Sequence, residues 1–194
     1  MPAPARTSRE AIVEAARALL EQEGLDAVVM SAVAERVGVR GPSLYKHVAD
    51  RSALIRAVGD LVTADLRATL ERAMSTGDPD ADLRALAREY RAFVQANPHG
   101  YGLLFAHLEP DLQPDQVAVA DLGRPIVAAV ARLIGGEGLD ALESGRTLVA
   151  WAHGFVSMEL AGGFRLGGDL DAAYATGIDL ILAGISERAS PASG

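Results

Sequence analysis

The sequence has no cysteine, a single lysine and no hydrophobic run long enough to cross a membrane. Without cysteine the chain forms no disulfide, thiolate metal site or cysteine nucleophile, which fits a reducing compartment. The longest apolar run without a charged side chain spans residues 147–158, whereas a membrane-spanning helix needs about 20 residues. The first residues also lack the apolar core of a signal peptide. These absences predict a soluble, cytoplasmic protein.

The charge of the chain is distributed unevenly along its length. The net charge of the whole chain is -8, which by itself argues against nucleic acid as a partner. Residues 1–60, however, carry eight basic and eight acidic side chains, while residues 61–194 carry ten and eighteen. The acidic surplus therefore lies entirely in the second part, and the first part remains compatible with a polyanionic partner.

Apolar residues recur with the period of an α-helix along most of the chain, and no stretch alternates with the period of a strand. We therefore expect an all-α fold. The expected helical segments span about residues 8–23, 33–37, 42–48, 50–74, 83–97, 101–108, 139–161 and 171–187. A further helix ends near residue 134 and begins either near residue 115, with a kink at Pro125, or at Pro125 itself. Thr7 and Glu10 have the spacing of a capping box at the first helix.

The second and third expected helices are joined by a turn of four residues, Gly38 to Gly41. Three helices with such a turn form a helix-turn-helix, whose last helix can enter the major groove of DNA. Around the third helix, Leu44 and Val48 keep apolar spacing, and the polar residues between them suit a polyanion because hydroxyl, imidazole and cationic groups bind phosphate. A solvated polar face is the alternative interpretation.

Residues 9–60 resemble the DNA-binding domain of the tetracycline-repressor (TetR) family of bacterial transcription regulators. The resemblance rests on the Gly38-Val39 turn, the Leu-Tyr-x-His-Val sequence at residues 44–48 and the charged residue before Leu54. It implies a DNA-binding domain over residues 1–60 and a helical ligand-binding and dimerisation domain over 61–194. It also implies that base edges are contacted by Arg40, Gly41, Pro42, Ser43 and Lys46, and phosphates by Tyr45, His47 and Arg51.

The sequence departs from the family pattern at two positions. Val29 stands where the family usually has a threonine that caps the second helix and contacts a phosphate, so we expect Ser31 to cap a slightly shorter helix instead. Gly41 has no side chain at a position from which a base could be read. Arg40, which can pair bidentately with guanine, is therefore the candidate for direct base readout.

Residues 80–188 resemble, more loosely, the ligand-binding and dimerisation half of the same family. The similar subgroup has a Trp-His-Gly signature, which stands here as Trp-Ala-His-Gly at residues 151–154. Independently of the resemblance, the helices expected over 139–161 and 171–187 are apolar on two faces, and the second face needs a partner. We expect these two helices to join their copies in the four-helix bundle of a homodimer.

Aromatic residues gather in the second half of the chain, where they could line an apolar pocket for a small-molecule effector. Core packing is the alternative role for each of them. The candidate ligand-binding residues are Tyr101, Phe105, His107, Trp151, Phe155 and Met158.

No catalytic or cofactor motif occurs in the sequence, so we expect neither an enzyme nor a bound cofactor. A zinc site at His99, His107, Glu109 and Asp111 has no recognised ligand spacing, and we expect no metal. The predicted function is that of a ligand-responsive regulator, a repressor that binds a palindromic operator in double-stranded DNA as a homodimer. A dimeric helical interaction protein, or an all-α enzyme without DNA binding, is the alternative.

Overall fold

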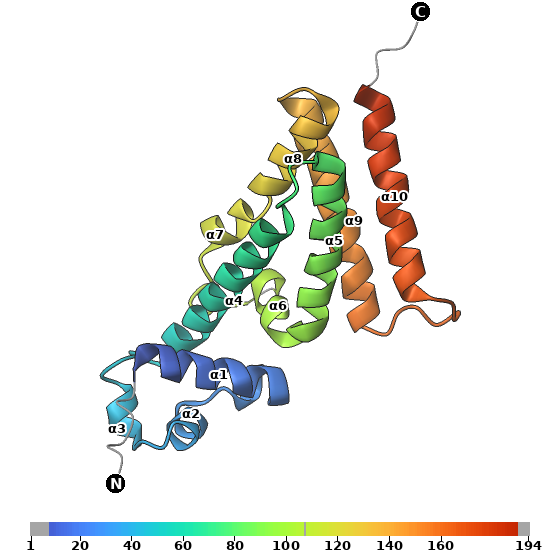
Figure 1. Cartoon of the computed structure of the whole chain (residues 1–194). Coiled ribbons are helices and arrows are strands. Elements are labelled where there is room, and N and C mark those ends of the chain that lie inside the picture. The colour runs from blue at the N-terminus through green and yellow to red at the C-terminus, as the bar shows by residue number, and fades with distance from the viewer. Residues whose placement is uncertain (1–7, 107, 190–194) are drawn as a thin grey trace, which may run out of the picture. The chain divides into compact units, whose positions relative to one another are not determined.

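A computed structural model of the chain describes residues 8–106 and 108–189, and all regular structure in these ranges is helical (Figure 1). The prediction of an all-α fold is confirmed. The helices are α1 (Arg9–Glu23), the 3₁₀ turn η1 (Leu25–Ala27), α2 (Met30–Arg36), α3 (Gly41–Leu44), α4 (Arg51–Ala73), α5 (Pro79–Ala96), α6 (Pro98–Phe105), α7 (Gln116–Asp121), α8 (Arg124–Ile134), α9 (Leu139–Leu160) and α10 (Leu170–Ala189). None of the helices searched in these ranges is long and apolar enough to span a membrane.

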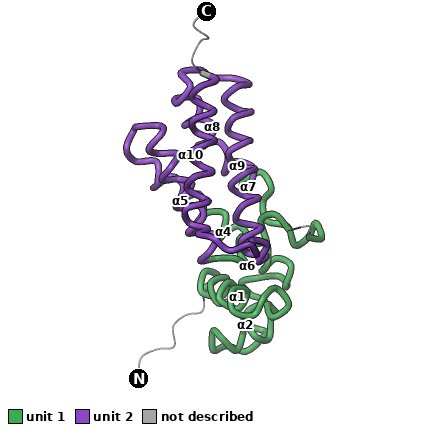
Figure 2. Tube along the Cα trace, turned by 90° about the vertical axis from the view of Figure 1, so that its right-hand side faces the viewer, with its two compact units in different colours: residues 1–64, 97–119 green, residues 65–96, 120–194 purple. Residues whose placement is uncertain are grey.

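The chain divides into two compact units (Figure 2). Unit 1 contains residues 1–64 and 97–119, and unit 2 contains residues 65–96 and 120–194. The expected domain boundary at residue 60 lies near the break inside α4. Residues 97–119 nevertheless belong with the N-terminal helices, because they pack and hydrogen-bond against α1 and α4.

The core of unit 1 is built from the apolar faces of α1, α2 and α4 around the short helix α3. On α1 and α4, residues three or four apart are fully buried, as the sequence period requires. The buried side chains include Ile12, Ala16, Leu20, Val33, Leu44, Leu54 and Val58. Complete burial of a leucine such as Leu44 contributes roughly 1.5–3 kcal/mol to folding. This side chain therefore anchors the short helix α3 to the core.

The first residues of α1 and α2 differ in two details from the capping that the sequence predicts. Ser8 caps α1, because its Oγ accepts the backbone N–H of Ala11 at 3.2 Å; Thr7 lies outside the described residues. Ser31 does not cap α2 but lies inside it. The N-cap is Val29, two residues before Ser31. Its backbone is extended and its carbonyl accepts the N–H of Val33 at 3.1 Å, without any side-chain cap.

Unit 2 packs α5, α8, α9 and α10 together. The region around Pro125 contains two helices: α7 ends at Asp121, and α8 begins at Arg124 with the proline in its first turn, where its missing N–H has no cost. Two glycines allow close helix contact. A Cβ at Gly145 would lie 2.9 Å from Val127 Cγ2, and a Cβ at Gly177 would lie 2.0 Å from Trp151 Cζ2.

Candidate nucleic-acid interface and effector domain

The turn between α2 and α3 depends on Gly38. This residue has φ 71, a left-handed conformation that glycine adopts without strain. The turn lets the N–H of Val39 donate to the carbonyl of Ala34 at 2.9 Å, which satisfies one of the last carbonyls of α2. The chain then enters α3 with Pro42 in its first turn. Backbone geometry therefore gives the helix-turn-helix arrangement that the sequence predicts.

The residues around α3 separate into an anchored side and an exposed side. Leu44 and Val48 are buried, while Arg40, Tyr45 and Lys46 are exposed, Tyr45 to 57%. Of the remaining predicted DNA contacts, Pro42 and His47 are exposed, and Gly41 and Ser43 are half-buried. The helix is shorter than expected: it ends at Leu44, whose carbonyl accepts the N–H groups of both His47 and Val48 in the following turn. The polar residues predicted to contact DNA thus lie on one short, exposed segment.

Arg51 is placed differently from the other predicted DNA contacts. It is half-buried at the start of α4. Its Nε donates to the carbonyl of Val28 at 2.7 Å, and its Nη2 donates to the carbonyl of Leu25 at 2.8 Å. The family resemblance implies a phosphate contact for this guanidinium. In the structure, one edge of the guanidinium is hydrogen-bonded to the turn before α2.

Other arginines of unit 1 also donate within the protein. Arg17 donates to Asn97 Oδ1 at 2.8 Å, Arg36 donates to Gln22 Oε1 at 3.0 Å, and Arg56 donates to the carbonyl of Asp111. The side chains of Arg40 and Lys46, by contrast, have no hydrogen-bond or ion-pair partner within the described ranges. These two exposed cations are available to an external anion.

Residues 97–115 support the N-terminal helices from two sides. The carboxylate of Glu21 in α1 accepts the backbone N–H groups of Gly100 at 2.7 Å and of His99 at 3.1 Å, and so caps the start of α6. Beyond α6, Ser52 Oγ donates to Asp111 Oδ2 at 2.7 Å. Because the partners come from α1 and α4, this segment ties the two helices together.

The candidate ligand-binding residues fall in both units. In unit 1, Tyr101 is buried and Phe105 is half-exposed, with their ring centroids 5.1 Å apart. His107 lies outside the described residues. In unit 2, α9 carries the other three: Trp151, Phe155 and the half-exposed Met158. Trp151 and Phe155 belong to an aromatic cluster that also contains Phe164 and Tyr174, with ring centroids 4.7 to 5.4 Å apart.

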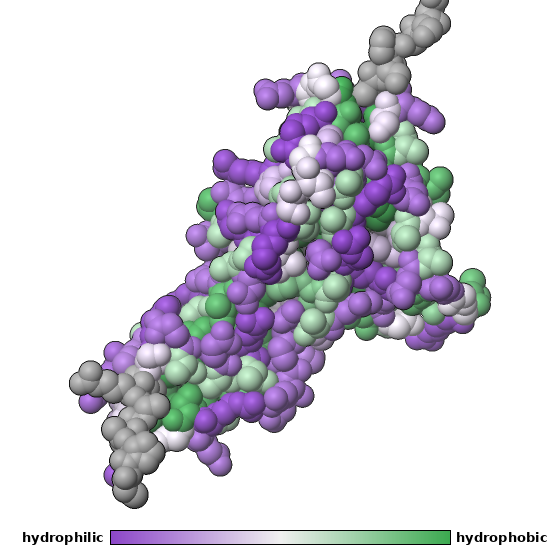
Figure 3. Space-filling view, in the orientation of Figure 1, coloured by the Kyte–Doolittle hydropathy of each residue, from purple (hydrophilic) through white to green (hydrophobic). Residues whose placement is uncertain are grey.

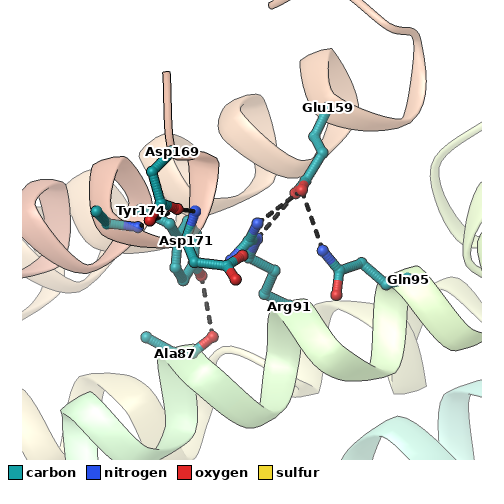
Figure 4. A network of polar contacts seen from close by, with 8 residues as sticks. Ala87, Arg91, Gln95, Glu159, Asp169, Asp171 and Tyr174 are labelled. Carbon is teal, nitrogen blue, oxygen red and sulfur yellow. Dashed lines mark hydrogen bonds and ion pairs between the residues drawn. The ribbon is translucent and has the colours of Figure 1, made fainter. Parts of the chain in front are cut away.

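A charged network borders this aromatic cluster (Figure 4). Arg91 of α5 donates to both carboxylate oxygens of Glu159, at 2.9 and 2.7 Å, and forms an ion pair with Asp171 at 2.8 Å. Its guanidinium lies 5.2 Å from the ring centroid of Tyr174 and 5.9 Å from that of Phe155. The hydrogen bonds from Arg91 lower the pKa of Glu159, whereas burial raises the pKa of Tyr174, whose hydroxyl donates to the Ala87 carbonyl at 3.0 Å.

The network was not foreseen from the sequence, although one signal was present. Arg91 falls on the same helical face as the buried Leu83, Ala87 and Val94, and an arginine on an apolar face requires buried partners. A hollow of about 240 Å³ elsewhere in unit 2 contains none of the candidate ligand residues. Its lining is Ile134, Gly136, Glu137, Asp140, Ser144, Ile185 and Arg188. The side chains described in the structure form no group of three or more that could hold a metal ion.

Comparison with protein families matches the two parts of the chain separately. Residues 12–58 match the model of bacterial regulatory proteins of the tetR family, and residues 83–181 match that of the tetracyclin repressor-like C-terminal domain. The first match contains α3 and its flanking turns, and the second contains Arg91 and the aromatic cluster of α9 and α10.

Whole-chain relatives agree with these matches. An uncharacterized HTH-type transcriptional regulator of Mycobacterium tuberculosis is 33% identical over 162 residues, which cover 82% of this chain and 73% of that protein. Among solved structures, a protein with unknown function from Rhodococcus sp. RHA1 has a TM-score of 0.80 at 26% identity, covering 96% of this chain and 99% of that one. A TetR variant from Acinetobacter baumannii in complex with minocycline has a TM-score of 0.65 at 21% identity, covering 96% and 100%. The protein belongs to the TetR family of transcriptional regulators.

Proposed function

We propose that the protein is a ligand-responsive repressor that binds a palindromic operator as a homodimer and leaves it when a small apolar or amphipathic effector binds. The observation that carries the proposal is the exposed segment around α3. It presents two cations without internal partners, Arg40 and Lys46, beside the exposed hydroxyl of Tyr45. Several neighbouring arginines are bonded within unit 1, so the anion-binding groups concentrate on the part of the fold that suits a major groove.

The segment supports a division between base and phosphate contacts. Arg40 stands at the N-terminal end of α3, the end from which recognition helices contact base edges, and its fork of N–H groups matches guanine O6 and N7. Gly41, Pro42, Ser43 and Lys46 complete the proposed base-facing set. Tyr45 and His47 are assigned to phosphates, which fix orientation on the duplex without reading sequence.

The homodimer is proposed to form through α9 and α10. Leu180 of α10 is 69% exposed, and Val149 and Leu160 of α9 are 38% and 43% exposed, although each lies on a long helix with a well-packed opposite face. Hydrophobic patches are visible along α10 in Figure 3. A two-fold axis at this face would pair two copies of the exposed segment around α3, residues 40–47, which we call the recognition segment. The two segments would then read half-sites about 34–36 Å apart or somewhat more.

The effector is proposed to contact the aromatic cluster of unit 2, with Trp151, Phe155 and Met158 as candidate contacts. Tyr101, Phe105 and His107 stay separate candidates, proposed from the sequence alone. Support comes from the aromatic cluster and its bordering polar groups, the combination that small-molecule sites use. The minocycline complex of the Acinetobacter protein shows a small-molecule ligand on the same fold. Differential binding of such a ligand to two arrangements of the dimer would release the operator.

Binding to DNA across a salt series tests the proposal. The purified protein is mixed with the DNA upstream of its own gene and with a random duplex of equal length, from about 50 to 200 mM salt. A dimer that contacts several phosphates loses affinity by orders of magnitude over this range, and the operator stays preferred at each concentration. If neither duplex binds at low salt, the DNA-binding function is wrong and the helical interaction protein becomes the better interpretation.

A further inference from the structure

We infer that Arg51 is a positioning residue for the recognition segment, one that acts by bracing the helix-turn-helix and makes no phosphate contact. The inference rests on the proposed DNA-binding function and changes the role that family resemblance implies for this residue. Its basis is the pair of hydrogen bonds from Arg51 Nε and Nη2 to the carbonyls of Val28 and Leu25, 2.7 and 2.8 Å long.

The two ends of this contact enclose the recognition module. Val28 lies two residues before α2 begins at Met30, and Arg51 lies seven residues after α3 ends at Leu44. A bond between them therefore closes the segment that contains both helices of the motif. At the same point, Asp50 caps the first turn of α4, because its Oδ1 accepts the N–H of Ala53 at 2.7 Å. The start of α4 and the start of α2 are held together across α3.

The carbonyl of Val28 needs this partner, whereas that of Leu25 also accepts the N–H of Val28 at 3.2 Å. Val28 has φ -76 and ψ 78, outside helical and strand geometry, and its side chain is 1% exposed, so its carbonyl belongs to no regular ladder. Within the described residues, the hydrogen-bond donor to that carbonyl is the guanidinium of Arg51. A polar backbone group buried beside the core without a partner destabilises the fold, and the guanidinium removes that cost.

The geometry also explains why arginine stands at this position. A guanidinium presents Nε–H and Nη2–H side by side, and this edge reaches two carbonyl oxygens at once. An ammonium carries the same charge at a single point on a flexible stem. A phosphate contact would tolerate lysine here, whereas a brace between two fixed carbonyls would not.

The test compares Arg51→Lys and Arg51→Gln with Lys46→Gln, a matched loss of charge on the exposed segment. For each variant, thermal unfolding gives Tm, and operator binding across salt gives affinity and the slope of log K against log salt. If Arg51 positions the recognition segment, both Arg51 variants should lower Tm by roughly 5 °C and weaken operator binding about tenfold. The slope of log K against log salt should stay at its wild-type value. Lys46→Gln should keep Tm and reduce the slope by about 0.9, because it removes one exposed cation that neutralises DNA charge and releases counterions.

The opposite pattern overturns the inference. If Arg51→Gln reduces the slope as much as Lys46→Gln does, while Arg51→Lys restores slope, affinity and Tm, then Arg51 contacts a phosphate. Unchanged affinity in both Arg51 variants also overturns the positioning role. Failure of the proposed function is a separate result, since in that case the wild-type chain itself binds no operator; the Tm of Arg51→Lys still decides whether the brace exists.

Discussion

Arg91 and Glu159 are 68 residues apart in the sequence and form a two-point ion pair between α5 and α9, with Nε–Oε2 and Nη2–Oε1 distances of 2.9 and 2.7 Å. Both side chains are largely shielded, 10% and 15% exposed. Gln95 donates a further hydrogen bond to the same carboxylate at 3.0 Å. The pair joins the two helices beside the aromatic cluster and thereby fixes the surroundings of the candidate effector residues.

Removing one partner of this ion pair should lower the free energy of unfolding more than replacing both partners with apolar residues. Glu159→Met leaves Arg91 with its main partner removed and should lower the free energy of unfolding by about 2–4 kcal/mol. The double variant Arg91→Met/Glu159→Met should lose less than the sum of the single variants, because no unpaired charge stays behind. Urea unfolding of the four proteins measures the coupling; strictly additive effects would show that the pair contributes no interaction energy.

The pair should also make stability depend on pH in the acidic range. Hydrogen bonds from Arg91 hold the pKa of Glu159 below its ordinary value of 4.5. A carboxylate with a lowered folded-state pKa stabilises the fold at pH above its unfolded pKa, and this contribution is lost as the pH falls through the folded value. The difference in unfolding free energy between wild type and Glu159→Gln should therefore be full at neutral pH and shrink well below pH 4.5. A difference that stays constant down to strongly acidic pH would contradict the assignment.

Arg40 and the two residues assigned to phosphates, Tyr45 and His47, should affect DNA binding in different ways. Arg40→Ala should reduce the preference for operator over random DNA by about 1–3 kcal/mol, because it removes a bidentate base contact. Tyr45→Phe and His47→Ala, which alter proposed phosphate contacts, should weaken both duplexes similarly. Competition binding with the two DNAs separates these effects. An equal loss on both duplexes for Arg40→Ala would exclude direct base readout by this residue.

The contact between Gly177 and Trp151 should tolerate no added methyl group. A Cβ at Gly177 would lie 2.0 Å from Trp151 Cζ2, so Gly177→Ala must displace the indole and should destabilise the protein by about 1–3 kcal/mol. Gly154→Ala is the matched control in α9, since nothing lies within 4 Å of its added Cβ and alanine favours a helix. Thermal unfolding should show a lower Tm for the first variant and no decrease for the second.

Leu180 should be essential for the proposed homodimer. Leu180→Glu places a charge on the exposed apolar face of α10 and should shift the protein toward monomer, with weaker operator binding as a consequence. Leu166→Glu changes a leucine that is fully exposed in the loop between α9 and α10, and this control should keep the wild-type mass. Sedimentation velocity measures the mass of each variant and so distinguishes monomer from dimer. A dimer that survives Leu180→Glu unchanged would place the interface elsewhere.

Glu21 should hold α6 in unit 1. Its carboxylate accepts the backbone N–H groups of His99 and Gly100. Glu21→Ala removes this acceptor from both N–H groups and should lower the free energy of unfolding by about 1–3 kcal/mol. Glu23→Ala is the control on the same helix, because that side chain is exposed. Hydrogen exchange should show faster exchange at residues 99–101 in the first variant alone.

The helices and the polar character of the segment around α3 follow from local sequence patterns. The spacing of Leu44 and Val48, the left-handed Gly38 and the exposed Arg40 and Lys46 are local features, set by residues within a few positions of one another. Periodicity and turn chemistry depend on neighbours in the chain, so they can be interpreted before any tertiary contact is known. The N-cap of α2 was nevertheless expected at Ser31, two residues after its observed place at Val29, whose side chain makes no capping hydrogen bond.

Which charged groups are bonded within the protein depends on long-range packing. Arg51 bonds to carbonyls 23 and 26 residues away, Glu21 to backbone groups 78 and 79 residues away, and Arg91 to a carboxylate 68 residues away. No local pattern specifies such pairs, because an arginine has the same chemistry whether its partner is a phosphate or a distant carbonyl. Packing brings the partners within hydrogen-bond distance, and this proximity separates the cations that brace the fold from those left for DNA.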